Sequence, residues 1–126
     1  MNITLIRTKR TRWALDGELW ISGKKVCDTT ENLRHHLEEG TYKLELKRDP
    51  RPGRYRQKVP TIVGVSNGAI TYGNGVEKLR KKDVLIGKLQ CSGLCIHGRE
   101  TFRHLIERMT KAKQRTKQSV FTLTVV

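Results

Sequence analysis

The sequence predicts an α+β fold that is mainly β, with a mixed or antiparallel sheet and one amphipathic C-terminal helix. Short apolar and β-branched segments recur between turn residues along most of the chain, whereas apolar residues at helical spacing occur in one segment. A length of 126 residues suits one domain with one hydrophobic core. We therefore expect a single domain over residues 1–126, with about six to eight short strands.

The N-terminal part has the pattern of a meander. Residues 2–7 alternate apolar and polar side chains and include β-branched residues, which is typical of a strand. An Asp-Gly pair at 16–17 and a Ser-Gly pair at 22–23 are turn signals. Residues 13–28 are therefore predicted to form short strands joined by tight turns.

Later segments continue the sheet and add the helix. In residues 41–47, the alternation places Tyr42, Leu44 and Leu46 on one face of a half-buried strand. Residues 66–68 read as a hairpin turn. Further β segments are predicted at 61–65, 69–72, 84–86 and 119–126. The helix is predicted at 98–113 from one apolar stripe, formed by Phe102, Leu105, Ile106 and Met109.

Charge is the most unusual global property of the chain. Lys and Arg number 26 against 12 Asp and Glu, which leaves a net charge of +14. The summed field of such a protein attracts polyanions, but it does not identify which polyanion. Three cysteines, an odd number, suit a reducing compartment better than a disulfide framework.

Two cation-rich segments, over 47–58 and 74–82, are the candidate binding surface. Pro50, Pro52 and Gly53 interrupt regular structure in the first, which predicts an exposed loop. It offers phosphate contacts and one ring for base stacking, and the two segments together could line one groove. The candidate binding residues are Lys47, Arg48, Arg51, Arg54, Tyr55, Arg56, Lys58, Tyr72, Asn74, Lys78, Arg80, Lys81 and Lys82.

Five short motifs occur in an order that resembles a small domain family of phages and bacteria, itself of uncharacterised function. That family carries CxTLE, EGTY, IHxGN and GCxLVG landmarks, followed by a helix. The corresponding segments here are Cys27-Asp28-Thr29-Thr30-Glu31, Glu38-Glu39-Gly40-Thr41-Tyr42, Ile70-Thr71-Tyr72-Gly73-Asn74, Val84-Leu85-Ile86-Gly87 and Gly98-Arg99-Glu100-Thr101-Phe102-Arg103-His104-Leu105. The resemblance covers most of the chain and implies a β-rich fold.

Family members that keep the His and Gly-Cys of these motifs are distantly similar to L,D-transpeptidases, cysteine enzymes that act on peptidoglycan. Such chemistry needs a thiolate, a neighbouring histidine and donors for the oxyanion. Under the resemblance, Thr71 stands in place of the His, Asp83 in place of the Cys and Lys82 in place of the Gly. A hydroxyl and a carboxylate cannot perform thiol acyl transfer, so the resemblance implies a degenerate active site.

Other catalytic arrangements stay open. The Ser-Gly-Leu-Cys-Ile-His segment at 92–97 loosely resembles the transpeptidase nucleophile segment, with Cys95 as the thiol and His97 nearby. The other interpretation of Cys95 is a small core residue. Acid–base hydrolysis would use two carboxylates in one cleft, for which Asp83 and Glu31 are the candidates. Glu31 equally suits a bracing role at a turn.

Metal and phosphate sites have weaker signals. Cys91, Cys95, His97 and His104 carry suitable ligand atoms, but CxxxCxH is not a standard zinc spacing. Gly73-Asn74-Gly75 lacks the pattern of a nucleotide-binding loop. We therefore predict no metal and no cofactor.

The favoured hypothesis is a non-catalytic basic domain that binds an anionic polymer, such as nucleic acid or a cell-wall polymer, or an assembly partner. The alternatives are a peptidoglycan-directed enzyme that uses Cys95, and a protein that binds nucleic acid independently of sequence. No apolar run approaches the roughly 20 residues of a membrane span, and no signal peptide is recognisable. We expect a cytoplasmic or virion-associated protein that does not bind membranes.

Overall fold

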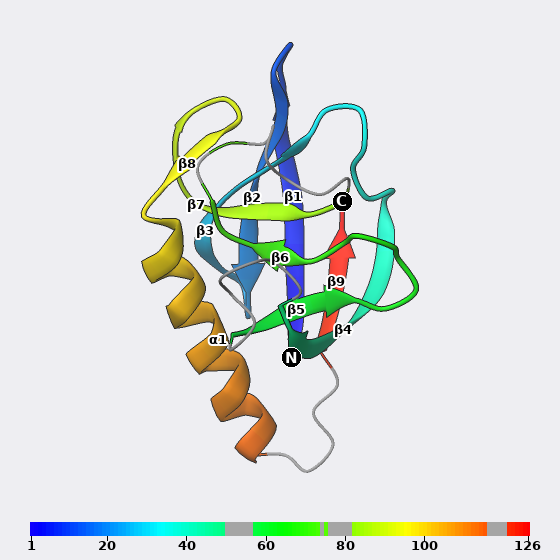
Figure 1. The fold of residues 1–126 in the computed structure, drawn as a ribbon, viewed down its shortest axis with the longest axis vertical. Coiled ribbons are helices and arrows are strands. Elements are labelled where there is room, and N and C mark those ends of the chain that lie inside the picture. Colours follow the sequence, from blue (N-terminus) through cyan, green and yellow to red (C-terminus); the bar gives the residue numbers. More distant parts are fainter. Residues whose placement is uncertain (50–56, 74, 76–81, 116–120) are drawn as a thin grey trace.

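The computed structural model describes residues 1–49, 57–73, 75, 82–115 and 121–126. It is mainly β with one helix near the C-terminus, as predicted (Figure 1). The elements are β1 (Asn2–Arg10), β2 (Ala14–Ile21), β3 (Lys24–Asn32), β4 (Gly40–Arg48), β5 (Lys58–Ile62), β6 (Ile70–Thr71), β7 (Val84–Cys91), β8 (Leu94–Ile96), α1 (Gly98–Arg115) and β9 (Phe121–Val125). The described residues thus form nine strands rather than the expected six to eight, because β7 continues to Cys91 and folds back as β8.

The strands form one mixed sheet that nearly closes on itself. Their order is β5-β4-β9-β1-β2-β3-β7-β6, with β8 paired to β7. The pairs β1–β9 and β6–β7 are parallel, and the other pairs are antiparallel. The two end strands of this order meet, because Thr61 bridges Ala69 and Ile62 N–H donates to Gly68 C=O at 3.0 Å. The sheet is therefore barrel-like, with its apolar residues turned inward.

The Asp-Gly pair at 16–17 is not a turn, and that prediction is wrong. Asp16 and Gly17 lie inside β2, paired with β1 on one side and β3 on the other. A Cβ on Gly17 would lie 2.5 Å from the backbone oxygen of Ile6 and 3.0 Å from Thr29 Oγ1. The glycine is required by close approach of the neighbouring strands rather than by a change of chain direction.

The Ser-Gly turn at 22–23 is confirmed. Ile21 pairs with Lys24, so Ser22 and Gly23 alone connect β2 to β3. Their φ angles are 52° and 77°, both left-handed, which is the geometry of a two-residue turn whose twist matches the flanking strands.

Helix α1 covers one side of the barrel-like sheet, beside β7 and β8 (Figure 1). Phe102, Leu105 and Met109 from the predicted stripe are buried in the common core. At the start of the helix, a Cβ on Gly98 would lie 3.0 Å from the Ile86 backbone oxygen and 3.1 Å from Tyr72 Cβ. The glycine therefore lets the helix begin directly against the sheet.

Candidate functional site

The candidate binding residues are only partly within the described chain. Those that can be located are Lys47, Arg48, Lys58, Tyr72 and Lys82. The others lie outside the described residues: Arg51, Arg54, Tyr55, Arg56, Asn74, Lys78, Arg80 and Lys81. Lys47 and Arg48 end β4 and Lys58 begins β5. Tyr72 directly follows β6, and Lys82 lies two residues before β7.

Three cations lie at the adjoining ends of β4 and β5, and we call them the β4–β5 cation cluster: Lys47, Arg48 and Lys58. Successive side chains alternate, so Lys47 lies on the opposite face of the sheet from Arg48 and Lys58. Arg48 is directly opposite Lys58 in the register. The next pair outward is hydrogen-bonded, since Asp49 N–H donates to Gln57 C=O at 2.8 Å. Antiparallel pairs alternate, so Arg48 and Lys58 form a pair of the non-hydrogen-bonded kind, in which side chains lie closest.

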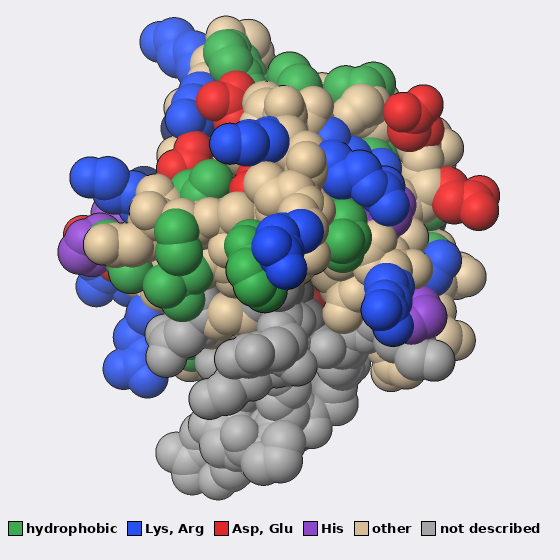
Figure 2. All heavy atoms as spheres, turned by 90° about the horizontal axis from the view of Figure 1, so that it is seen from above, with side chains coloured by type: hydrophobic (Ala, Val, Ile, Leu, Met, Phe, Trp, Pro, Cys, Tyr) green, Lys and Arg blue, Asp and Glu red, His purple; other side chains and the backbone are tan. Residues whose placement is uncertain are grey.

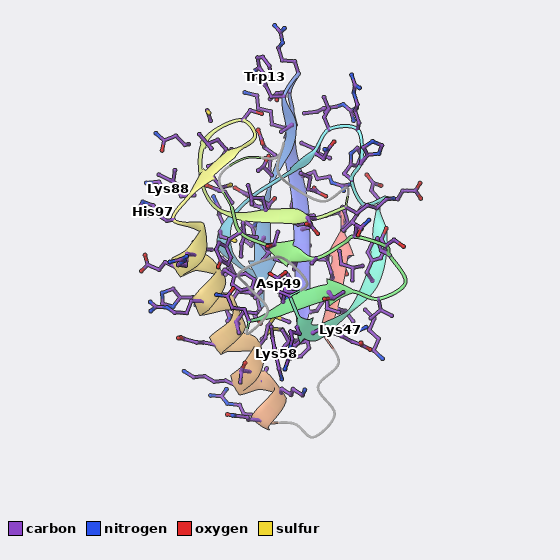
Figure 3. The ribbon with its side chains drawn as sticks, in the orientation of Figure 1. Trp13, Lys47, Asp49, Lys58, Lys88 and His97 are labelled. Carbon is purple, nitrogen blue, oxygen red and sulfur yellow. The ribbon has the colours of Figure 1, made fainter. Side chains whose placement is uncertain are left out.

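The charges in this cluster are poorly neutralised. All three side chains are exposed. Lys47 Nζ lies 3.3 Å from Glu45 Oε2, whereas Arg48 and Lys58 have no carboxylate partner within the described residues. By contrast, Lys25 contacts two carboxylates, Asp28 Oδ1 at 2.8 Å and Glu18 Oε2 at 3.1 Å. Figure 3 places Lys47 and Lys58 toward the lower end of the molecule.

One hydrogen bond joins described residues at the ends of the two cation-rich segments. The Tyr72 hydroxyl donates to Gln57 Oε1 at 3.1 Å, which links the end of the first segment to the residue two positions before the second. The Tyr72 ring is buried against Phe102, with centroids 5.0 Å apart. Tyr72 therefore joins structural elements, and its ring is not an exposed stacking surface. Lys82 is half-buried, and its N–H donates to Asn67 C=O at 3.1 Å.

The positions that the family resemblance assigns to catalysis are buried. Thr71 lies on β6 and pairs with Leu85, and Asp83 immediately precedes β7. Both residues have no exposed surface. General acid–base or nucleophilic chemistry needs contact with a substrate, which this burial does not provide.

The second candidate carboxylate has a structural role. Glu31 is buried on β3 and pairs in register with Val84, one residue from Asp83. Arg7 holds both of its oxygens, with Nε at 3.1 Å from Oε2 and Nη2 at 2.9 Å from Oε1. Arg7 Nη2 also donates to the Leu37 carbonyl. This fork-like pair braces the chain between β3 and β4.

The thiol of Cys95 lies in the interior, on β8, and only 1% of the residue is exposed. Burial, together with the nearby carboxylates of Asp28 and Asp16, raises the pKa of this thiol from 9.0 to about 12. Neutral thiol, a poor nucleophile, therefore dominates at physiological pH. This environment matches the core interpretation of Cys95 and not the reactive one.

His97 does not complete a catalytic pair with Cys95. The residue is exposed and has a left-handed φ of 57°, and no hydrogen bond joins its ring to Cys95 in the described part of the chain. Its backbone carbonyl accepts bonds from the Thr101 N–H at 3.1 Å and the Thr101 hydroxyl at 2.8 Å, at the start of α1. Among the residues placed in the structure, no three His, Cys, Asp or Glu side chains are grouped to hold a metal.

One further surface escaped the sequence analysis. The tip of the β1–β2 hairpin carries exposed Lys9, Arg10, Arg12 and Trp13, and it projects at the upper end of the molecule (Figure 3). Seen from above, this end presents several Lys and Arg side chains, interspersed with hydrophobic and acidic ones (Figure 2). The sequence signal that could have indicated this surface is the Arg12-Trp13 pair, which lies in a short connection between two predicted strands.

Within the described ranges, no helix combines the length and apolar character needed to cross a membrane. Comparison with protein-family models, with curated proteins and with solved structures gives no match to this chain.

Proposed function

We propose that this chain is a non-catalytic protein that binds an anionic polymer, with the β4–β5 cation cluster and the segments it borders as the binding surface. The observation that carries the proposal is the direct opposition of Arg48 and Lys58, neither of which forms an ion pair with a carboxylate among the described residues. Like charges at opposed positions destabilise a sheet. An anion seated between them removes this repulsion, so binding offsets a cost that the free protein bears.

The absence of catalysis in this proposal is supported by burial. Asp83 and Cys95, the two candidate reactive groups, both lie in the interior. The resemblance to the phage and bacterial family then fits a member that keeps the scaffold without the transpeptidase-like chemistry. A protein assembly partner with an acidic surface would use the same cations.

The test measures affinity for heparin and for DNA oligonucleotides as a function of salt. Arg48→Gln combined with Lys58→Gln should weaken binding, and for single strands it should lower the slope of log K against log salt by about 1.4, which is two phosphate contacts. The matched control is Lys111→Gln with Lys113→Gln, which removes the same charge from the exposed surface of α1.

Three results would contradict the proposal. If both double variants lose the same affinity, net charge alone determines binding. If neither heparin nor DNA binds at low salt, an anionic polymer is not the ligand. Turnover of a muropeptide that Cys95→Ser abolishes would instead establish an enzyme.

A further inference from the structure

The β1–β2 connection is a two-residue turn with an unusual composition. Arg10 pairs with Leu15, and Thr11 N–H donates to Ala14 C=O at 3.0 Å, so Arg12 and Trp13 alone reverse the chain. Neither has a positive φ. The Thr11 hydroxyl oxygen instead stabilises the turn by accepting the N–H groups of Trp13 and Ala14, each at 3.1 Å.

The tip is braced against the β7–β8 turn. The hydroxyls of Thr11 and Ser92 are hydrogen-bonded to each other. Two residues along β2 from Ala14, Asp16 Oδ1 accepts the Gly93 N–H at 3.2 Å and the Thr30 hydroxyl at 2.8 Å. Asp16 is only 2% exposed. The hairpin end is therefore supported by interior hydrogen bonds, and the turn residues are held in a defined position.

Trp13 does not stabilise the fold by packing. It is 64% exposed, and the Arg12 guanidinium lies 4.8 Å from its ring centroid. Lys9, Arg10 and Arg12 are also exposed and have no carboxylate partner in the described part of the chain. An exposed indole on a braced turn, with Arg12 beside it and exposed Lys9 and Arg10 on the strand leading to the turn, has the two properties of a single-strand contact: a stacking surface and phosphate-binding charges.

We propose that this hairpin tip binds single-stranded nucleic acid, with a base stacked on Trp13 and phosphates held by Lys9, Arg10 and Arg12. Bases in a duplex already stack on each other, so a protruding ring gains little there. A sulfated or wall polymer has no aromatic face for the indole. This inference rests on the proposed function, and it identifies the anionic polymer as single-stranded nucleic acid.

The tip and the β4–β5 cation cluster lie toward opposite ends of the molecule (Figure 3). One short oligonucleotide molecule is therefore expected to bind at the hairpin tip or at the β4–β5 cation cluster, but not at both. Only a longer strand can contact both surfaces at once.

The experiment uses the full chain with Trp20→Phe, which leaves Trp13 as the single tryptophan of the two present. The probes are a thymidine oligonucleotide of about eight residues, an abasic oligomer of the same length, and heparin. The thymidine oligomer should quench the fluorescence of Trp13, whereas the abasic oligomer and heparin should bind without that quenching. Trp13→Ala should weaken thymidine binding about tenfold and leave abasic binding unchanged.

The variants separate the two proposals. Arg48→Gln with Lys58→Gln should weaken binding of heparin and of both oligomers, with Trp13 quenching by bound thymidine retained. Equal affinity for thymidine and abasic oligomers, unaffected by Trp13→Ala, would overturn the tip assignment alone. Failure of all three polymers to bind would overturn the proposed function itself. Thermal unfolding of Trp13→Ala should match the parent because the indole is not part of the core.

Discussion

Replacing Lys58 by glutamate should make the protein more stable and a weaker polyanion binder at the same time. The substitution turns the opposed Arg48–Lys58 pair from repulsive to attractive, and cross-strand charge pairs contribute roughly 0.2 to 1 kcal/mol. Reversing the sign of the pair counts this energy twice, once for repulsion lost and once for attraction gained, and because both side chains are exposed, screening keeps the gain at about 0.5 to 1 kcal/mol. With an unfolding entropy of about 2.1 cal/mol/K per residue, this corresponds to a Tm rise of about 2 to 4 °C.

The binding loss follows from counterion release. One lost phosphate contact reduces single-strand affinity about fivefold at 0.1 M salt, and the new carboxylate adds repulsion. Tm is measured by circular dichroism at low salt and at 1 M salt, where the stability gain should shrink. Affinity is measured by fluorescence anisotropy with a labelled oligonucleotide.

The matched control is Lys24→Glu, which makes the same change of net charge, from +14 to +12. Lys24 is exposed and opposite Ile21, so no like-charge pair is relieved there. If Lys58→Glu lowers Tm, or if both variants bind equally well, the account of the β4–β5 cation cluster is refuted.

Three other predictions concern the interior. Arg7→Met should cost about 3 to 5 kcal/mol in urea unfolding because it leaves a buried carboxylate without its partner, and a smaller loss would mean that water replaces the guanidinium. Thr29→Val should not destabilise the fold because the Thr29 hydroxyl oxygen is buried without a hydrogen-bond partner among the described residues. Thr30→Val should cost about 1 to 3 kcal/mol through the lost bond to Asp16, and calorimetry that ranks the two variants the other way would contradict this. At pH 8 a thiol reagent should label exposed Cys91 and not Cys95, as read by mass spectrometry.

The raised pKa of Cys95 also predicts an alkaline limit to stability. Its thiol has a pKa of about 12 in the folded protein and 9.0 as the ordinary value. Its contribution should therefore be constant below pH 9 and fall by about 1.4 kcal/mol per pH unit from there toward pH 12, because only the unfolded chain ionises. Burial also raises the pKa of Cys27 to about 12, so Cys95→Ala should remove about half of this alkaline decline, and an unchanged profile would exclude the mechanism.

The sequence predicted elements whose signals are local, and missed those that depend on distant residues. The stripe of Phe102, Leu105 and Met109 predicted the helix correctly, and the Ser-Gly pair predicted its turn. The Asp-Gly pair has the same local signal, yet it lies in a strand. The Ile6 carbonyl that lies against Gly17 and the Gly93 N–H that binds Asp16 both belong to residues distant in sequence. The residues next to the Asp-Gly pair in the chain therefore do not predict these contacts.

By itself, the sequence determined the excess of positive charge, the main β character and the single helix, because composition and periodicity depend on residues close together in the chain. Only the tertiary structure decided that Arg48 faces Lys58, that Cys95 is enclosed and that Trp13 projects into solvent. Strand register and burial result from contacts between residues far apart in sequence, and no local pattern encodes which of them meet.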